Sequence, residues 1–295
     1  MNLNEQTFGT ELEYVRISRE FAAKAIQSVV GGDVRYSGGS YDAWECRAAD
    51  GRVWRAVNDG SLDAPSHLRS EVVTPILKYA DLDTLQEVVR ALRRAGARTT
   101  ACCSQHVHLG MENFTPEQIA NLAKIFYKQE ELILKALGTS ESRLAHYTRR
   151  TDASFIERIA SRKPRSSGEL NRAWFGRSNL NPEHYDPSRY RDLNLATLWR
   201  THTVEIRAAE GSTHAGEVKA VIVLCLALAV KAKTAKAASA AKREYNEASA
   251  KYDFRVFLLR LGLIGDEFKT VRQHLLKRLP GSAAWKNGRP AAVNA

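Results

Sequence analysis

Three short apolar segments of the chain each carry two polar side chains separated by one residue. The pairs are Glu11/Glu13 in GTELEYV, His106/His108 in SQHVHLG and Glu205/Arg207 in HTVEIRA. In a β-strand, alternate side chains point to the same face and lie about 6.5–7 Å apart. Each pair therefore places two metal- or phosphate-binding groups on one side of a sheet. The residues between them, Leu12, Val107 and Ile206, are expected to face apolar packing on the other side.

A single pair of this kind is weak evidence for a site. His-x-His in a strand is more often structural than catalytic, and Glu-x-Glu is usually the solvated face of an antiparallel sheet. Three pairs are more informative, because acids, imidazoles and a guanidinium on one face are costly to desolvate without cations. Divalent metal ions supply such charge. Glu71, near the end of another apolar segment, is a fourth candidate acid. A carboxylate-rich site suits Mg²⁺ or Mn²⁺, and Mn²⁺ tolerates an imidazole better.

The order of the predicted elements indicates an α+β fold. Strands are predicted within 7–17, 33–57, 68–75, 98–109 and 201–208, and helices at 18–30, 81–95, 115–137, 214–250 and 253–279. Strands and helices follow one another irregularly, and not as repeated βαβ units. We therefore expect a mainly antiparallel sheet with flanking helices.

The length of 295 residues suits one large domain or two modest ones. We expect a single catalytic domain over 1–279. It includes a loop-rich basic segment at 139–195 and C-terminal helices over 214–279. Residues 280–295 are expected to form a disordered tail.

The charge of the chain favours an anionic partner. Lys and Arg number 44 against 33 Asp and Glu, a net charge of +11. Residues 143–177 alone hold nine basic and three acidic side chains. Such a field attracts nucleotide phosphates, an acidic substrate or nucleic acid, although a solvated basic face is the alternative. Trp174 and Phe175 in this segment either stack on an adenine or belong to the local core.

Several common sites and locations are not indicated. The dipeptide Gly-Lys is absent, so there is no Walker A loop, and GxGxxG, HExxH and GxSxG are also absent. The four cysteines include no CxxC pair. The first fifteen residues lack a signal-peptide pattern, and the longest apolar run, 220–230, is too short to span a membrane. We expect a cytoplasmic protein with no membrane partner.

Five segments in their order along the chain resemble a known family. They are Gly9-Thr-Glu-Leu-Glu13, Asp59-Gly-Ser61, Glu71-Val-Val-Thr-Pro75, His106-Val-His108 and Thr203-Val-Glu-Ile-Arg207. The set is similar to that of the amidoligases, which are glutamine-synthetase-like carboxylate–amine ligases related also to glutamate–cysteine ligase. The resemblance covers roughly residues 7–230. It implies a glutamine-synthetase-like catalytic domain whose curved sheet holds ATP and two or three divalent ions, Mg²⁺ or Mn²⁺.

The resemblance also implies which acids and imidazoles bind metal. Glu11, His106 and Glu205 would hold the metal that bridges the terminal phosphates of ATP. Glu13 and Glu71 would hold the metal nearer the substrate carboxylate.

Catalytic and nucleotide-binding roles follow from the same resemblance. Arg207 would neutralise the transferring phosphoryl group. Arg191 and Asn194 would touch phosphate or substrate, and Asp59 would take the proton of the amine unless it only caps its turn. His108 would lie beside the metal ligands or face the bound substrates.

The implied reaction is ATP-dependent amide or peptide bond formation through an acyl phosphate. The carboxylate and amine are small molecules or peptides, and the acceptor could itself be a large anion. The chain is much shorter than glutamine synthetase and lacks a recognisable ammonium-binding flap residue, so the amine need not be ammonia. Two alternatives remain open, a metal-dependent hydrolase without ATP and a basic nucleic-acid-binding protein. Oligomers are common among related enzymes, and one is possible here.

Overall fold

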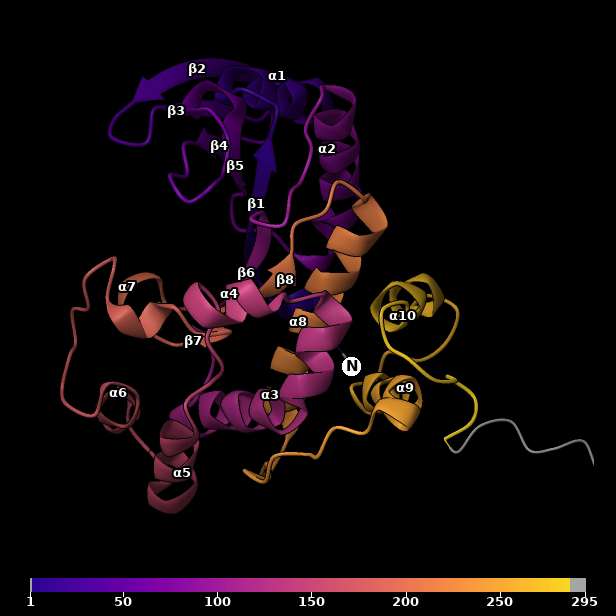
Figure 1. Cartoon of the computed structure of the whole chain (residues 1–295). Coiled ribbons are helices and arrows are strands. Elements are labelled where there is room, and N and C mark those ends of the chain that lie inside the picture. The colour runs from indigo at the N-terminus through magenta and orange to yellow at the C-terminus, as the bar shows by residue number, and fades with distance from the viewer. Residues whose placement is uncertain (1, 287–295) are drawn as a thin grey trace, which may run out of the picture.

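The computed structural model of the chain describes residues 2–286 and has an α+β fold (Figure 1). Its eight strands form a single open sheet in the order β2-β3-β4-β5-β1-β6-β8-β7. The strands are β1 Phe8–Val15, β2 Asp33–Gly38, β3 Ala43–Arg47, β4 Val53–Val57, β5 Arg69–Val73, β6 Ser104–Gly110, β7 Leu193–Asn194 and β8 Thr203–Glu210. All neighbouring strands in this order pair antiparallel, which confirms the predicted fold class.

The central strands have one apolar and one polar face. Leu12 of β1, Val107 of β6 and Ile206 of β8 are all buried in the hydrophobic core, as the i, i+2 pattern predicts. The polar residues on either side of each of them point to the opposite face, because side chains alternate along a strand. The functional side chains therefore lie on the face of the sheet that turns away from the core.

Four helices cover the apolar face of the sheet. They are α1 Arg19–Val30, α2 Leu82–Arg94, α3 Pro116–Leu137 and α8 Ala215–Thr234. Helix α1 packs on β3 and β4, α3 packs on β8, and α8 packs on β6 as well as on α2 and α3. The predicted helix starts are confirmed, since Ser18 caps α1 and Thr115 forms a capping box with Gln118 in α3.

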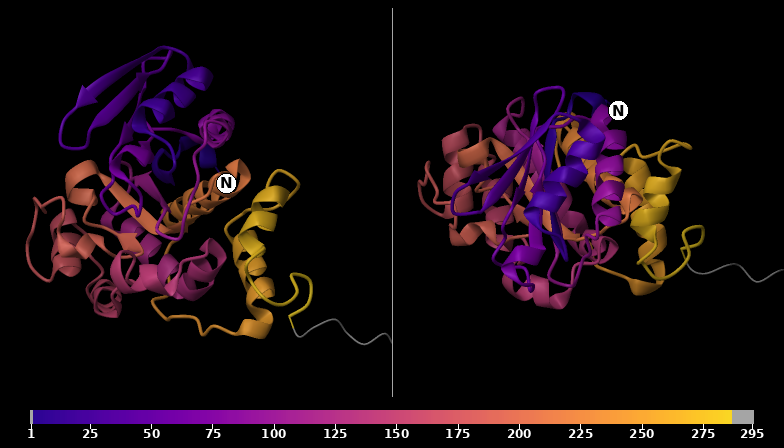
Figure 2. Two further views of the ribbon diagram at one scale, coloured as in Figure 1. Left: turned by 45° about the horizontal axis from the view of Figure 1, so that its top comes forward. Right: turned by 90° about the horizontal axis from the view of Figure 1, so that it is seen from above.

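Short helices and loops lie toward the other face of the sheet. These helices are α4 Glu141–His146, α5 Ala153–Arg162, α6 Ser167–Phe175 and α7 Leu198–Thr201. Figure 2 shows α1 and α2 on one side of the sheet and the segment from α5 to α7 on the other. Trp174 of α6 is buried and packs edge-on against Phe155 at 4.9 Å between ring centroids, while Phe175 packs against Trp199. Both aromatic residues have partners within this segment.

The long helix predicted over 214–250 is wrong at its C-terminal end. Helix α8 ends at Thr234, and residues 235–246 run without helix. The side-chain amide of Asn121 donates to Ala235 O at the helix end, and Lys242 pairs with the fully buried Glu130. An Ala- and Lys-rich sequence favours helix locally, but it has no apolar face here. The ion pair with a buried carboxylate is a tertiary contact that overrides this propensity.

The last two helices of the described part of the chain are α9 Ala250–Arg260 and α10 Lys269–Leu276. The disordered tail predicted over 280–295 falls mostly on residues 287–295, which lie outside the described residues. Within the described part, Pro280 O accepts a hydrogen bond from Lys251 N. None of the helices in residues 2–286 is long and apolar enough to cross a membrane.

Candidate active site

Strand register gathers the predicted side chains on one face of the sheet. Glu13 of β1 is paired with Glu71 of β5, and Glu11 is paired with His106 of β6. His108 is paired in turn with Glu205 of β8. Directly paired residues in antiparallel strands point to the same side and lie within about 5.5 Å. The pairs at Glu11/Glu13, His106/His108 and Glu205/Arg207 therefore form one continuous polar surface across β5, β1, β6 and β8.

The first cluster on this surface consists of Glu11, His106 and Glu205, with one potential ligand atom of each within 4.8 Å of the others. His106 Nδ1 lies 2.9 Å from Glu11 Oε2 and 3.6 Å from Glu205 Oε1. His108 Nε2 lies 3.2 Å from Glu11 Oε1 and 3.6 Å from Glu205 Oε1, and it makes no hydrogen bond within residues 2–286. Asn194 Nδ2 donates to Glu205 Oε2 at 2.7 Å. The three residues predicted to hold the phosphate-bridging metal are thus brought together.

The second cluster consists of Glu13, Asp59 and Glu71, whose carboxylate oxygens also come within 4.8 Å of one another. Glu13 Oε2 accepts a hydrogen bond from Ser104 N at 2.6 Å, which fixes its orientation. Asp59 also caps its own turn, because its Oδ1 accepts from Ser61 N at 2.7 Å. The two acids predicted for the second metal lie side by side, and the loop acid joins them as a third carboxylate.

Burial and neighbouring charges shift the pKa values of the carboxyl groups in the two clusters in opposite directions. Burial alone opposes ionisation of Glu11, but the charge of His108 and the hydrogen bond and charge of His106 hold its pKa well below the ordinary value. Burial likewise opposes ionisation of Glu205, whose pKa Arg207 and the two histidines nevertheless lower to about 2. Burial raises the pKa of Glu71 well above its ordinary value, and the charges of Glu11, Glu13 and Asp59 raise it further. The raised pKa of Glu71 reflects the crowding of negative charge in the second cluster, which is the condition that a bound cation relieves.

Arg207 links the first cluster to the adjoining cavity. Its guanidinium pairs through Nη1 with Glu205, and the side chain is only 6% exposed. Its Nε is buried and has no hydrogen-bond partner among the residues that the structure describes. A buried donor without a partner is costly, so it is a position where a ligand oxygen is expected to bind.

Cavities open beside both clusters. The largest of those that touch them is about 640 Å³ and is lined by Glu11, Asp59, Glu71, His106 and Arg207 together with other basic and aromatic side chains. A cavity of about 140 Å³ reaches Glu13, and one of about 130 Å³ reaches His108, Asn194 and Glu205. These three cavities share Arg189, which stacks over Tyr185 with 5.4 Å between its guanidinium carbon and the ring centroid.

Arg191 is the one predicted site residue that does not line these cavities. Its Nη1 donates to Arg150 O at 2.7 Å, and its Nη2 lies 3.7 Å from Asp152. Sequence reasoning missed Arg189, two residues earlier, and the hydrogen-bonded pair Tyr41 and Tyr185 at the rim. The signal for Arg189 and Tyr185 was the basic, loop-rich character of 139–195, which does not single out one residue, and Tyr41 lies outside that segment.

A comparison with known families agrees with this arrangement. The family model described as "Putative amidoligase enzyme" matches residues 4–229 of the chain. The chain belongs to this amidoligase family. The match confirms the family resemblance predicted from the five segments, and it covers nearly the same residues. No curated protein matches the chain. Family membership supports ligase activity for this amidoligase, whereas the roles of single residues rest on the geometry above.

The buried carboxylic acid Asp192 connects two strands of the amidoligase site. Asp192 and Glu130 are both completely buried, and burial followed by the charge of Glu130 raises the pKa of Asp192 well above its ordinary value. Asp192 Oδ1 accepts from Thr151 Oγ1 at 2.7 Å and from Leu193 N at 2.8 Å. Its backbone oxygen accepts from Arg207 N at 2.9 Å. The residue therefore joins β7 to the strand that carries Arg207.

Asp192→Asn is expected to change how the stability of the amidoligase depends on pH. An acid whose pKa is raised by folding contributes stability that is complete below its unfolded pKa of about 3.9 and is lost as pH rises through the folded value. Asn imitates the neutral carboxyl, so the variant escapes this loss. Relative to the wild type, its free energy of unfolding should rise with pH above about 4, by up to ~1.4 kcal/mol per pH unit.

Urea denaturation of both proteins between pH 4 and pH 8 measures this difference. Asp63→Asn, the same substitution at an exposed loop position, is the matched control. A difference between Asp192→Asn and the wild type that stays constant over this range would contradict the expectation.

Proposed function

We propose that this amidoligase is an ATP-dependent carboxylate–amine ligase that forms an amide or peptide bond through an acyl phosphate. The observation that carries the proposal is the meeting of two acidic clusters and Arg207 on one face of the sheet, in a chain of the amidoligase family. A glutamine-synthetase-like origin of the sheet is part of the proposal.

The donor sets of the two clusters fit divalent cations. Glu11, His106 and Glu205 offer two carboxylates and an imidazole, whereas Glu13 and Glu71 offer carboxylates alone, with the carboxylate of Asp59 beside them. Oxygen ligands suit Mg²⁺, and the set that contains an imidazole suits Mn²⁺ as well. Bound metal would offset the charge that gathers when a triphosphate meets a carboxylate.

The chain's own residues then position and stabilise the reacting groups. A carboxylate is a poor electrophile, so one of its oxygens first attacks the γ-phosphorus of ATP and ADP leaves. The amine then attacks the acyl carbon, and phosphate leaves with the oxygen that came from the carboxylate. Arg207 places its unpartnered Nε where the phosphoryl oxygens gain charge.

Asp59 is the proposed acceptor of the amine proton. It lines the 640 Å³ cavity beside Glu71, and a carboxylate can take a proton once the amine has begun to bond to carbon. The amine must be unprotonated to attack, so the rate should rise with pH until the metal-binding groups or the base become limiting.

The rim of the cavity fits an anionic substrate. Arg55, Arg189 and Arg200 line the cavity together with Tyr41 and Tyr185. Several cationic groups at one opening attract polyanions and raise their local concentration. The charge of the rim is therefore suited to binding ATP, an acidic carboxylate substrate or a larger anionic acceptor.

A screen for ADP release tests the proposed function. The protein is incubated with ATP, Mg²⁺ or Mn²⁺, and paired sets of carboxylates and amines that include amino acids and short peptides. We expect ADP and phosphate in equal amounts only when both substrates of the correct pair are present. Hydrolysis of an amide without ATP would instead identify a metal-dependent hydrolase. Binding of mixed RNA or DNA that weakens steeply with salt, without ADP release, would identify a nucleic-acid-binding protein.

A further inference from the structure

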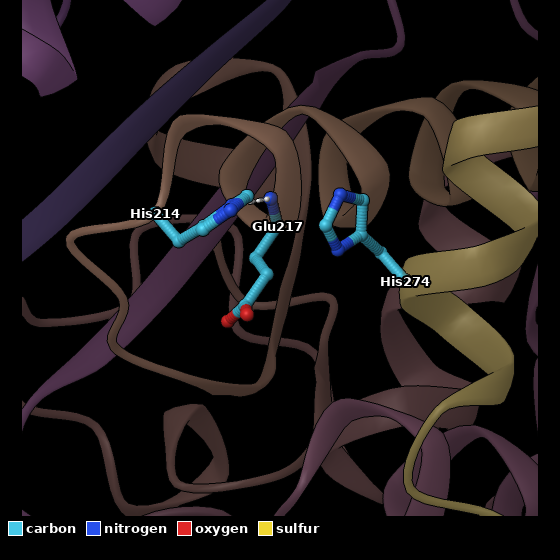
Figure 3. A group of neighbouring side chains, drawn as sticks. All are labelled: His214, Glu217 and His274. Atoms are coloured by element: carbon cyan, nitrogen blue, oxygen red, sulfur yellow. Dashed lines mark hydrogen bonds between the residues drawn. The ribbon is translucent and has the colours of Figure 1, made fainter.

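A third group of potential metal ligands lies apart from the sheet face, where α10 meets the N-terminus of α8 (Figure 3). His214 is the residue that precedes α8, Glu217 lies in the first turn of that helix, and His274 projects from α10. One ring nitrogen of each histidine and one carboxylate oxygen lie within 4.8 Å of one another. We propose that His214, Glu217 and His274 form a binding site for a divalent transition-metal ion such as Zn²⁺.

The chain is shaped locally to bring the two rings together. The centroids of the rings of His214 and His274 lie 4.9 Å apart. A Cβ atom at Gly216 would lie 2.6 Å from His274 Nε2 and 3.0 Å from His214 Cε1. A side chain at this position would therefore separate the imidazoles, whereas glycine lets both rings meet over the first turn of α8.

The donor types select the class of ion. Two imidazoles and one carboxylate suit Zn²⁺ and other borderline transition metals, whereas Mg²⁺ and Ca²⁺ prefer oxygen ligands. The site differs in this respect from the carboxylate-rich clusters on the sheet.

Contacts already made by His214 and by both carboxylate oxygens of Glu217 compete with an ion, and one of them is the hydrogen bond that Glu217 Oε2 accepts from Ser212 Oγ at 2.9 Å. His214 Nδ1 accepts a hydrogen bond from Glu217 N at 3.3 Å, a length beyond the usual range, so little is lost when the ring releases it. Glu217 also pairs with Lys277 of the segment that follows α10. Lys277 therefore competes with the ion for the carboxylate. Replacing Lys277 should strengthen Zn²⁺ binding, whereas replacing a ligand should weaken it.

The position of the site gives it a structural consequence. His214 and Glu217 lie within the residues matched by the amidoligase model, and His274 lies beyond residue 229, where that match ends. An ion held by all three would link the C-terminal helix to the start of α8. Arg278 already contacts Glu210, at the end of β8, by an ion pair at 3.0 Å. The ion would add a second tie between this helical unit and the end of the strand that carries Glu205 and Arg207.

Zn²⁺ titration of the whole protein by calorimetry, with excess Mg²⁺ present to occupy oxygen-rich sites, tests the proposal. We expect His274→Ala to bind one Zn²⁺ fewer per chain than the wild type, and Glu217→Gln to bind that ion at least tenfold more weakly. His67→Ala removes an exposed histidine elsewhere and should bind as the wild type does. Equal number and affinity of Zn²⁺ ions in the wild type and in both ligand variants would overturn the proposal.

Lys277→Gln separates ligation from a merely structural role. Without metal it removes an ion pair, so it should lower the melting temperature slightly or not at all. With the competitor gone, Zn²⁺ should bind more tightly and raise the melting temperature by more than in the wild type. Unchanged or weaker Zn²⁺ binding in Lys277→Gln would count against Glu217 as a ligand. None of these measurements uses the ligase assay. The metal-site proposal can therefore be refuted while the proposed ligase function stands, and the ligase function can be refuted while the metal site stands.

Discussion

Glu11→Gln and His106→Ala are each expected to lower the rate of ADP release by at least about 100-fold while leaving the fold intact. Both side chains belong to the first cluster, in which Glu11 Oε2 lies 2.9 Å from His106 Nδ1. Gln keeps the shape of Glu11 but removes the negative charge that a cation requires. Ala at position 106 removes the only imidazole of that cluster.

The fold should tolerate both changes. Glu11 is partly exposed toward the cavity, and its neighbour Leu12 supplies the apolar contact of this part of β1. Removing the Glu11 charge also relieves repulsion with Glu71, whose raised pKa reflects that charge. We therefore expect near-native circular dichroism and a modestly lower melting temperature, because each change removes the contact between Glu11 and His106.

Steady-state ADP release at saturating Mg²⁺ or Mn²⁺ measures the loss of activity. Glu112→Gln and His67→Ala are matched controls, because they make the same changes at exposed positions outside the clusters. Wild-type turnover in both Glu11→Gln and His106→Ala would contradict the assigned site.

Arg207→Lys should lower kcat by about 10- to 100-fold and change ATP affinity much less. Lysine keeps the positive charge, so the long-range attraction for the triphosphate remains. It loses the planar guanidinium, in which Nη1 is held by Glu205 while Nε stays free for a ligand oxygen. The loss should therefore fall on the step in which charge moves onto the phosphoryl oxygens.

The two effects are measured separately, kcat by ADP release and ATP affinity by equilibrium binding with metal present. Arg177→Lys makes the same change on the exposed surface of the basic segment and serves as the control. Weakened ATP binding with kcat unchanged would show that Arg207 contributes to binding alone.

The sheet could be predicted from the sequence because its signals are local. Alternation around Leu12, Val107 and Ile206 marks strands with one buried face, and Ser18 and Thr115 mark helix starts through their own side chains. The irregular order of the elements then favours antiparallel pairing. Strand register, and with it the opposition of Glu11 to His106, follows only once the strands are paired.

The elements that sequence reasoning missed depend on contacts far apart in the chain. Helix α8 ends at Thr234, and the segment that follows it places Lys242 against the carboxylate of Glu130, which lies more than a hundred residues earlier in the chain. No local sequence pattern contains this contact. The same holds for Arg189, which reaches the cavities through the fold of its loop, and for His274, which meets His214 through the docking of α10. Residue type alone could not distinguish these side chains from the other basic and imidazole groups.

Transfer of oxygen-18 from the labelled carboxylate substrate to phosphate is the most direct test of ligation through an acyl phosphate. The substrate pair identified by the ADP screen is supplied with both carboxylate oxygens labelled, and the released phosphate is analysed by mass spectrometry. The account predicts one labelled oxygen in each phosphate and the other in the amide product. Phosphate that carries no label, released together with the amide, would contradict it.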